Sequence, residues 1–236
     1  MVGQLIWADE FDAREGAPPD PAWWSHEVGG HGWGNDELQA YTSDPANASH
    51  DGQGNLVIRA LKRGDAITSA RLITKGRFDF RHGRVEARAL LPVGSGLWSA
   101  IWMLGSDIDE VGWPGCGEID VMENLGADPG RVFGTVHCPA HSGSNGVSGE
   151  ATRRPTPPGT YRLFAVDWAP GSIIWSVDGR EYHSVSPAQL GASWVFDHPF
   201  YLLVNLAVGG TLGGALGEDT RFPAEFKLDY LRVYSR

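Results

Sequence analysis

The chain is dominated by short segments in which apolar and polar residues alternate or apolar residues run continuously. Segments of this kind, bounded by Gly, Pro, Asn or Asp, predict β-strands. The predicted strands cover residues 55–61, 83–91, 97–104, 118–123, 162–169, 172–179, 200–210 and 227–234. The segment 200–210 is almost entirely apolar, which predicts a central strand that is covered on both faces.

The segments between these strands carry few helical signals. Short turns around residues 21–25 and 186–190 are the helical candidates, and Asp178-Gly179 predicts a tight hairpin. The polar stretch from Pro139 to Thr160 is rich in Gly, Ser and Pro and predicts a surface loop beside a binding cleft. Because the chain shows no repeat and no linker, the pattern predicts one all-β domain over residues 1–236, an antiparallel β-sandwich.

Composition adds an expectation about aromatic surfaces. The chain contains 32 glycines and 10 tryptophans among 236 residues. The glycines agree with many tight turns between short strands. Ten tryptophans exceed what a core of this size needs, so we expect some of them at the surface, where a flat ring can stack on a ligand. Trp7, Trp168 and Trp175 are expected in the core.

The formal net charge of −10 narrows the range of partners. A negative field repels nucleic acid and anionic membranes but does not hinder a neutral polysaccharide. No apolar run approaches the ~18 residues that can span a bilayer. Residues 1–12 lack the basic segment and apolar core of a signal peptide, so a secreted form of this protein would carry its signal outside this sequence.

Residues 115–124 hold the most informative group, Glu118, Asp120 and Glu123. Residues two apart in a strand share a face, so Glu118 and Asp120 point the same way, whereas a regular strand would turn Glu123 to the other face. A β-bulge at Val121–Met122 would bring Glu123 back. When carboxylates lie close together, their repulsion raises the pKa of at least one of them, which keeps that group protonated near neutral pH. Retaining glycoside hydrolysis uses one ionised and one protonated carboxyl, roughly 5–5.5 Å apart.

Two other interpretations of these acids stay open. E-x-D-x-x-E is by itself a weak motif, often found on a solvated strand face, and three carboxylates could bind a hard cation. Apolar residues between the acids and the nearby Trp98, Trp102 and Trp113 favour a catalytic cleft. Trp98 and Trp102 are four residues apart in a predicted strand and therefore share a face. They predict a wall for sugar rings, with two core tryptophans as the alternative.

Eight segments, in order along the chain, resemble glycoside hydrolase family 16 in its laminarinase-like branch of endo-β-1,3-glucanases. They are residues 7–12, 33–42, 69–88, 96–104, 112–124, 134–139, 201–210 and 228–234. The resemblance implies a concanavalin A-like jelly roll with a cleft on its concave sheet. It also implies hydrolysis of β-1,3-glucan, including mixed β-1,3/1,4-glucan, without a catalytic cofactor. The extra residue Met122 sets the chain apart from lichenases, which are similar but have the shorter E-x-D-x-E.

The resemblance assigns roles by position. Glu118 is the expected nucleophile, Asp120 its assistant and Glu123 the general acid/base. The resemblance further implies sugar-binding positions at Asn35, Arg71, His137 and Asn205, with His137 beside Glu118 and Arg71 alternatively balancing the acidic cluster. A related galactan hydrolase such as an agarase is the nearest alternative enzyme. A non-catalytic β-glucan-binding protein is the alternative of another class, although such relatives typically lose the acids. We expect a secreted monomer.

Two structural features are further expectations. Cys116 and Cys138 lie near one level of a predicted hairpin, so they predict either a cross-strand disulfide or two buried thiols, and they fit no zinc pattern. The resemblance implies a structural calcium ion on the convex face, with Glu10, Gly54 and Asp229 at the matching positions.

Overall fold

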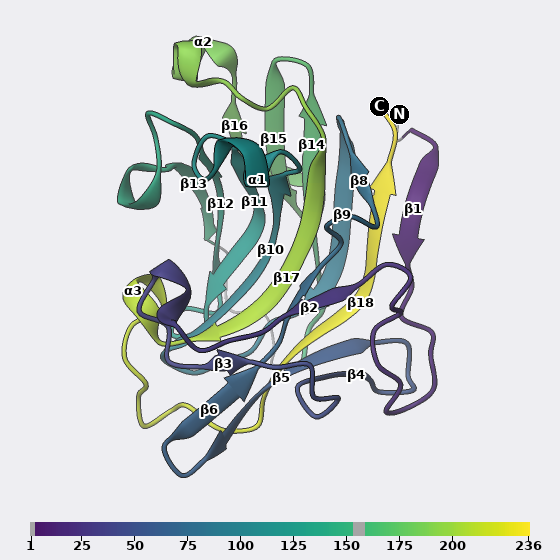
Figure 1. Cartoon of the computed structure of the whole chain (residues 1–236), viewed down its shortest axis with the longest axis vertical. Coiled ribbons are helices and arrows are strands. Elements are labelled where there is room, and N and C mark those ends of the chain that lie inside the picture. The colour runs from purple at the N-terminus through teal and green to yellow at the C-terminus, as the bar shows by residue number, and fades with distance from the viewer. Residues whose placement is uncertain (1–2, 153–158) are drawn as a thin grey trace.

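The protein is a β-sandwich of two sheets, seen here in a computed structural model that describes residues 3–152 and 159–236 (Figure 1). The ten-stranded sheet has the order β16-β15-β14-β9-β18-β5-β6-β3, with β1 beside β18 and β4 beside β5. These strands are β16 Arg180–Val185, β15 Ser172–Val177, β14 Arg162–Ala169, β9 Gly83–Leu90, β18 Ala224–Tyr234, β5 Leu56–Arg63, β6 Ala66–Ser69, β3 Ala40–Tyr41, β1 Leu5–Asp9 and β4 Ala48–His50.

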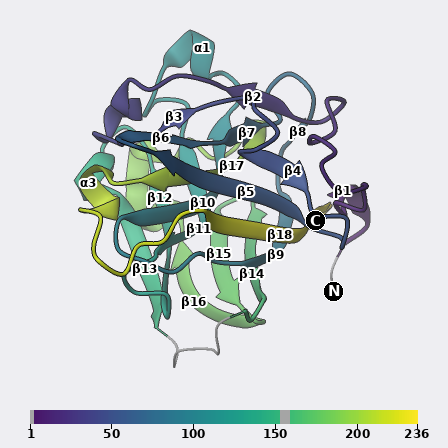
Figure 2. The same cartoon turned by 90° about the horizontal axis from the view of Figure 1, so that it is seen from below.

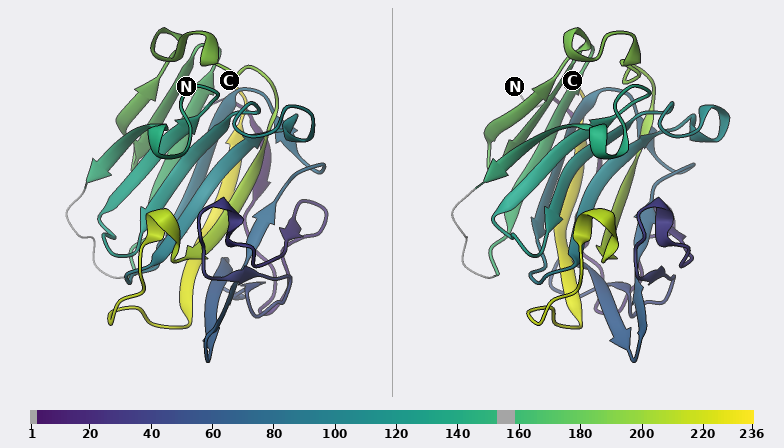
Figure 3. Two further views of the ribbon diagram at one scale, coloured as in Figure 1. Left: turned by 60° about the vertical axis from the view of Figure 1, so that its left-hand side comes forward. Right: turned by 90° about the vertical axis from the view of Figure 1, so that its left-hand side faces the viewer.

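The eight-stranded sheet has the order β13-β12-β11-β10-β17-β7-β2, with β8 beside β17. Its strands are β13 Val147–Thr152, β12 Arg131–His137, β11 Glu118–Leu125, β10 Leu97–Gly105, β17 Phe200–Val208, β7 Arg71–Ile73, β2 Ser25–Glu27 and β8 Asp79–Phe80. Figures 2 and 3 show the two sheets as stacked layers. The pairing is antiparallel except between β3 and β6, so the predicted jelly-roll sandwich is confirmed for the described residues.

Helical structure is confined to single turns in the connections. These are α1 Ile108–Val111, α2 Pro187–Leu190, α3 Gly210–Gly213 and the 3₁₀ turns η1 Gly32–Gly34, η2 Gly143–Asn145 and η3 Gly191–Ser193. The predicted turn at 186–190 is confirmed as α2, where Ser186 and Gln189 form a capping box. The predicted hairpin is also confirmed, because Asp178 and Gly179 both have positive φ, as a type I′ turn requires.

The apolar residues gather in two places. The main core lies between the sheets and includes Trp7, Trp168 and Trp175, as predicted. A second cluster contains Ile73, Leu104, Cys116, Tyr201 and Leu203. Strand β17 supplies residues to both clusters and is buried along its whole length, which explains its continuous apolar sequence.

One predicted connection is partly wrong. The stretch from Pro139 to Thr160 was expected to be a loop, but it contains β13, which pairs with β12 at the edge of the eight-stranded sheet. Its burial alternates between half-buried and exposed, so no residue of β13 is fully buried and no apolar pattern marks the strand. Residues 153–158 of the same stretch lie outside the described residues.

The cysteines are free thiols, so the disulfide prediction is wrong and the alternative of two buried thiols holds. Register explains why. His137 pairs with Glu118, so Cys138 lies opposite Gly117, and Cys116 is one position further along. Cys138 points into the main core, whereas Cys116 belongs to the second cluster. The two side chains therefore lie on opposite faces of the sheet.

This arrangement gives a first prediction. Because the two sulfur atoms face different clusters, we expect denatured, unreduced protein to titrate with two thiols per chain, and native protein to react slowly because both cysteines are buried. Ellman's reagent with and without denaturant measures both values. A denatured protein without reactive thiols would contradict the structure.

Candidate active site

The three acids lie on β11, whose regular pairing is interrupted between them. Asp120 pairs with Thr135 of β12 and Glu123 pairs with Phe133, so Val121 and Met122 together face the single residue Gly134. The register with β10 shifts at the same point. The predicted β-bulge is thus confirmed. The extra residue returns Glu123 to the face of Glu118, and it leaves the apolar Val121 and Met122 in the core.

Each acid has a defined set of partners. Trp113 Nε1 donates to Glu118 Oε2 at 2.7 Å, and Trp98 Nε1 donates to Glu123 Oε1 at 3.0 Å. His137 Nε2 lies 3.4 Å from Asp120 Oδ2 and 3.9 Å from Glu118 Oε1. His137 therefore contacts the acids, as expected. Asp120 is 3 % exposed and its Oδ2 accepts no hydrogen bond from the described residues.

Burial and mutual repulsion shift the titration of all three acids. Removal from water, reinforced by the charge of Asp120, raises the pKa of Glu118 to about 8. Removal from water, reinforced by the charge of Glu118, raises the pKa of Glu123 to about 7. The pKa of Asp120 is also raised well above its ordinary value by burial and then by Glu123. The cluster therefore holds protons near neutral pH, as acid/base chemistry requires.

The three predicted surface tryptophans frame the acids. Trp98 and Trp102 of β10 are half-buried, and the alternating residues Leu97, Ser99 and Ile101 supply the core face. Neither ring belongs to the main core, and Trp102 packs against the second cluster. Trp113, in the segment just before β11, is 47 % exposed although its indole N–H binds Glu118. Together the rings give the acids an apolar border that remains open to solvent.

A second group of polar residues adjoins Trp102. Trp102 Nε1 donates to Asn205 Oδ1 at 2.7 Å, and Asn205 Nδ2 donates to the Tyr41 hydroxyl at 3.0 Å. Each end of the Asn205 amide therefore has one hydrogen-bond partner within an apolar strand. The Arg71 guanidinium lies over the rings of Trp33 and Trp102, at 4.8 and 4.6 Å from their centres.

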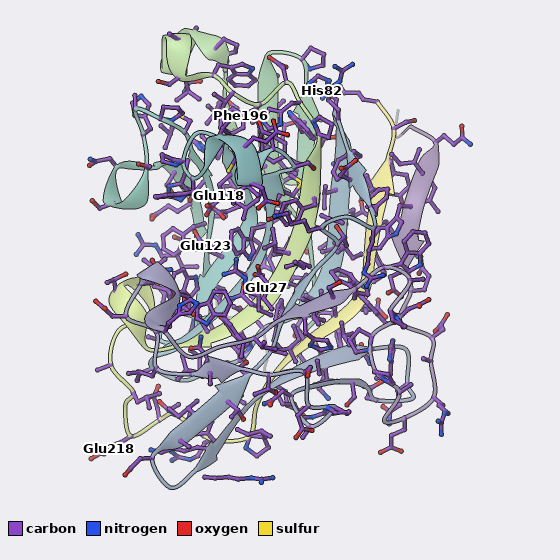
Figure 4. All side chains as sticks on the ribbon, in the orientation of Figure 1. Glu27, His82, Glu118, Glu123, Phe196 and Glu218 are labelled. Carbon is purple, nitrogen blue, oxygen red and sulfur yellow. The ribbon has the colours of Figure 1, made fainter. Side chains whose placement is uncertain are left out.

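The charge partner of Arg71 differs from the expectation. Arg71 Nε lies 2.5 Å from Glu27 Oε2, so Arg71 neutralises Glu27 and the proposal that it balances the acidic cluster is wrong. Figure 4 shows Glu27 below Glu118 and Glu123. The guanidinium stands beside the aromatic border and not against the three acids.

Sequence analysis missed Glu37, which organises this group. Its carboxylate accepts hydrogen bonds from Asn35 Nδ2 at 3.2 Å, Gln39 Nε2 at 2.6 Å and the Tyr41 hydroxyl at 3.1 Å. The spacing of residues 37, 39 and 41 is the strand period of two, which could have revealed their common face. Asn35 therefore joins this group through its hydrogen bond to Glu37.

The three residues expected to bind calcium lie in one part of the fold, but their side chains are not arranged around a common point. Asp9 pairs with Leu231 and Leu56 pairs with Leu228, so the register brings Glu10 and Gly54 to the part of β18 that contains Asp229. The carboxylate of Glu10, however, binds Arg232 at 2.7 Å, and that of Asp229 binds Arg88 at 2.5 Å. In this structure, the Glu10 and Asp229 carboxylates form ion pairs with arginine side chains and are not arranged as ligands of one cation.

A different group has the spacing of metal ligands. Within residues 3–152 and 159–236, the one set with ligand atoms all within 4.8 Å of one another is Glu118, Asp120 and His137. Two of these residues, Glu118 and Asp120, lie on β11, and His137 lies on the neighbouring strand β12. No helix among the described residues is long and apolar enough to cross a membrane.

The site defines a class of protein. Buried carboxylic acids that hold protons near neutrality lie on one face of a strand, between indole rings suited to the apolar faces of sugars. This combination is that of a glycoside hydrolase on a jelly-roll sandwich.

The comparisons with known proteins agree with that class. The family model described as glycosyl hydrolases family 16 matches residues 35–232, and the chain belongs to this family. A β-glucanase from Rhodothermus marinus is 43 % identical over 98 % of this chain and 85 % of its own length. Two solved structures cover nearly the whole chain. An endo-β-1,3-glucanase from Pyrococcus furiosus has a TM-score of 0.92, with 44 % identity over 99 % of this chain and 94 % of that one. The laminarinase catalytic domain from Thermotoga maritima has a TM-score of 0.91, with 42 % identity over 100 % and 99 %.

Proposed function

We propose that this glycoside hydrolase cleaves β-1,3-linked glucan within the chain, with retention of anomeric configuration. The observation that carries the proposal is the bulge in β11, which sets Glu123 on the face of Glu118, with Glu123 buried and the Glu118 side chain 15 % exposed. The similarity to proteins named endo-β-1,3-glucanase and laminarinase supports the choice of β-1,3-glucan. Mixed β-1,3/1,4-glucan is a second substrate of the same proposal.

In the first step, protonated Glu123 acts as general acid. It donates its proton to the glycosidic oxygen while the Glu118 carboxylate attacks the anomeric carbon, which breaks the glycosidic bond and leaves the sugar covalently attached to Glu118. The Trp98 N–H orients the Glu123 carboxyl and the Trp113 N–H orients the Glu118 carboxyl. These two hydrogen bonds hold each carboxyl in a defined orientation before the reaction begins.

Attack requires that Glu118 be ionised, although burial raises the pKa of this carboxyl to about 8. Asp120 resolves this requirement. The pKa of Asp120 is itself raised well above the ordinary value by burial and by the charge of Glu123, so a proton can rest on Asp120 while Glu118 attacks as the carboxylate. His137, beside both carboxyls, stabilises the charge that remains.

In the second step, Glu123 has lost its proton and acts as general base. It removes a proton from water, whose oxygen attacks the anomeric carbon and displaces Glu118, so that the product regains its original configuration. Glu123 recovers the protonated state in which it began. The two displacements need no cofactor.

The aromatic and polar residues beside the acids are the proposed sugar-binding surface. We assign stacking to Trp98, Trp102 and Trp113, and hydrogen bonding to sugar hydroxyls to Asn35, Arg71, His137 and Asn205. Support comes from the fixed orientation of these groups, since Arg71 is held over Trp102 and Asn205 is held between Trp102 and Tyr41. Such pre-ordering lowers the entropic cost of binding.

The test is the anomeric form of the first product. Laminarin, lichenan and agarose are incubated with the enzyme, and the first minutes of hydrolysis are followed by proton NMR. We expect the β-anomer to form first from laminarin, followed by mutarotation. Initial release of the α-anomer would overturn the retaining mechanism, and reducing ends from agarose but not laminarin would favour the galactan hydrolase.

The non-catalytic alternative fits the site less well. A protein that only binds glucan has no need to bury three mutually repelling carboxyls, because each unpaired or like-charged buried group lowers stability. Binding of laminarin without release of any reducing ends would favour that alternative.

We propose separately that calcium binds at Glu10, Gly54 and Asp229. The register of β18 with its neighbours supports this, and binding requires Arg232 and Arg88 to release their carboxylates. At a calcium concentration of about 100 Kd, linkage gives ~2.7 kcal/mol and hence a melting temperature higher by roughly 5–10 °C than in chelator. The variant Asp229→Asn should lose this difference. Equal melting temperatures in calcium and chelator would exclude the site.

Three broader expectations remain proposals. We propose that residues 1–236 form one catalytic domain, which the pairing of β1 with the last strand β18 supports. We also propose that the protein is secreted, since polymeric glucan is too large to enter a cell, and that it is a monomer. Because both cysteines are free thiols, no disulfide bond supports the proposal that the protein is secreted.

A further inference from the structure

The bulge that positions Glu123 has a specific support beneath it. Trp175 of β15, in the other sheet, is fully buried, and its indole Nε1 donates to the backbone carbonyl of Asp120 at 2.7 Å. Asp120 is the last residue of β11 in regular register with β12 before the bulge. A side chain of the ten-stranded sheet thus reaches across the core to the point where the catalytic strand departs from regular geometry.

The space for this indole is provided by a glycine. Gly134 is the one residue of β12 that faces the two bulge residues. A Cβ atom at Gly134 would lie 2.3 Å from Cδ1 of Trp175, a distance that no packed structure tolerates. The bulge, the glycine opposite it and the indole below it therefore fit together as one unit.

The unit extends to the neighbouring strands. Gly134 pairs with Gly149 of β13, and Trp175 pairs with His183 of β16. A Cβ at Gly149 would lie 2.3 Å from Cγ of His183, and the rings of Trp175 and His183 are 4.9 Å apart. The rings of Trp175 and His183 therefore pack against the two paired glycines of the opposite sheet. This contact sets the distance between the two sheets beneath the three acids.

We propose that Trp175 is a positioning residue for the acid/base pair, acting through its hydrogen bond to the Asp120 carbonyl and its contact with Gly134. This inference rests on the proposed roles of Glu118 and Glu123. Without the indole N–H, the bulge lacks its anchor, and Asp120 and Glu123 are free to shift relative to Glu118. A displacement of about 1 Å in catalytic groups can reduce the rate about 100-fold.

The test compares two tryptophans of the same kind. Trp168 is also fully buried, and its Nε1 donates to the backbone carbonyl of Phe196 at 2.9 Å. Phe196 lies outside β11, in the connection before β17, and its ring comes close to Gly117. Trp175→Phe and Trp168→Phe each remove one buried hydrogen bond and part of one ring, so they are matched in their structural effect. Only Trp175→Phe removes a hydrogen bond to β11 itself.

We expect Trp175→Phe to lower kcat on laminarin about 10- to 100-fold with KM changed less than about threefold. The alkaline limb of its pH–rate profile should move to lower pH, because a loosened site admits water and relieves the burial that raises the pKa of Glu123. Trp168→Phe should retain kcat within about threefold and the wild-type profile. Equal losses of kcat in both variants, or an unchanged profile in Trp175→Phe, would overturn the inference.

A second pair of variants repeats the comparison with the indole in place. Gly134→Ala pushes a methyl group against Trp175, whereas Gly149→Ala pushes one against His183. We expect the larger loss of kcat in Gly134→Ala, and equal losses would count against Trp175. Glu123→Gln separates this inference from the proposed function. An active Glu123→Gln would refute the proposed role of Glu123, whereas an inactive one beside a normal Trp175→Phe would refute the positioning role alone.

Discussion

Replacement of Glu118 by Ala is expected to lower kcat on laminarin on the order of 10⁴-fold or more, while the protein still binds the glucan. The loss is large because the substitution removes the carboxylate that forms the covalent bond of the first step. Binding should persist because Trp102, Arg71 and Asn205 keep their contacts with one another. Reducing-end assays measure the first effect and affinity electrophoresis in laminarin measures the second.

Glu123→Ala is the matched control for this prediction, and azide distinguishes the two variants. In Glu118→Ala, azide can occupy the space of the lost carboxylate and attack the same face of the sugar, which gives an α-glycosyl azide. In Glu123→Ala, Glu118 still forms the intermediate from an activated aryl glycoside, and azide then gives a β-glycosyl azide. Near-normal hydrolysis by Glu118→Ala, or the opposite assignment of the two azides, would displace Glu118 as nucleophile.

The second large effect concerns stability at alkaline pH. Burial raises the pKa of Glu118 to about 8 from an unfolded value of 4.5, so the folded state favours the protonated carboxyl. The stability that this preference contributes is present below pH ~4.5 and is lost as pH rises through the folded pKa near 8. Between pH 5 and pH 9 the wild-type free energy of unfolding should therefore fall more than that of Glu118→Gln, by on the order of 2–4 kcal/mol.

Urea unfolding at the two pH values measures this difference. Glu218→Gln is the control, because Glu218 is exposed in a loop at the far end of the molecule from the three acids (Figure 4). The control should follow wild type at both pH values. If Glu118→Gln lost as much stability as wild type between pH 5 and pH 9, the ionisation of Glu118 would not oppose folding. The prediction implies that the active site is maintained at a cost in stability.

The sequence predicted those strands whose burial leaves a clear pattern of apolar residues. The period-two pattern located the main strands, and the continuous apolar run of β17 predicted its burial on both faces. The bulge followed from the need to bring Glu123 to the face of Glu118. Strand β13 escaped detection because an edge strand with no fully buried residue carries no such pattern.

Side-chain partners over long sequence separations could not be predicted in the same way. The ion pair of Arg71 with Glu27 depends on the placement of β2 beside β7. The register of β11 with β12 decides that Cys116 and Cys138 face different clusters. Nothing local to residues 115–124 indicates that Trp175, from the other sheet, supports the bulge. These contacts depend on tertiary packing and become visible only in the folded chain.

The central claim is that Glu118 forms a covalent bond with the sugar and that Glu123 assists on the same face of β11. The most direct test is to trap that bond with a 2-deoxy-2-fluoro-β-laminaribioside bearing a good leaving group, because fluorine slows both steps and the leaving group restores the first. The account predicts an increase in intact mass by one fluoro-laminaribiosyl unit and a single labelled peptide with the label on Glu118. A label on Glu123 or Asp120 would contradict the account.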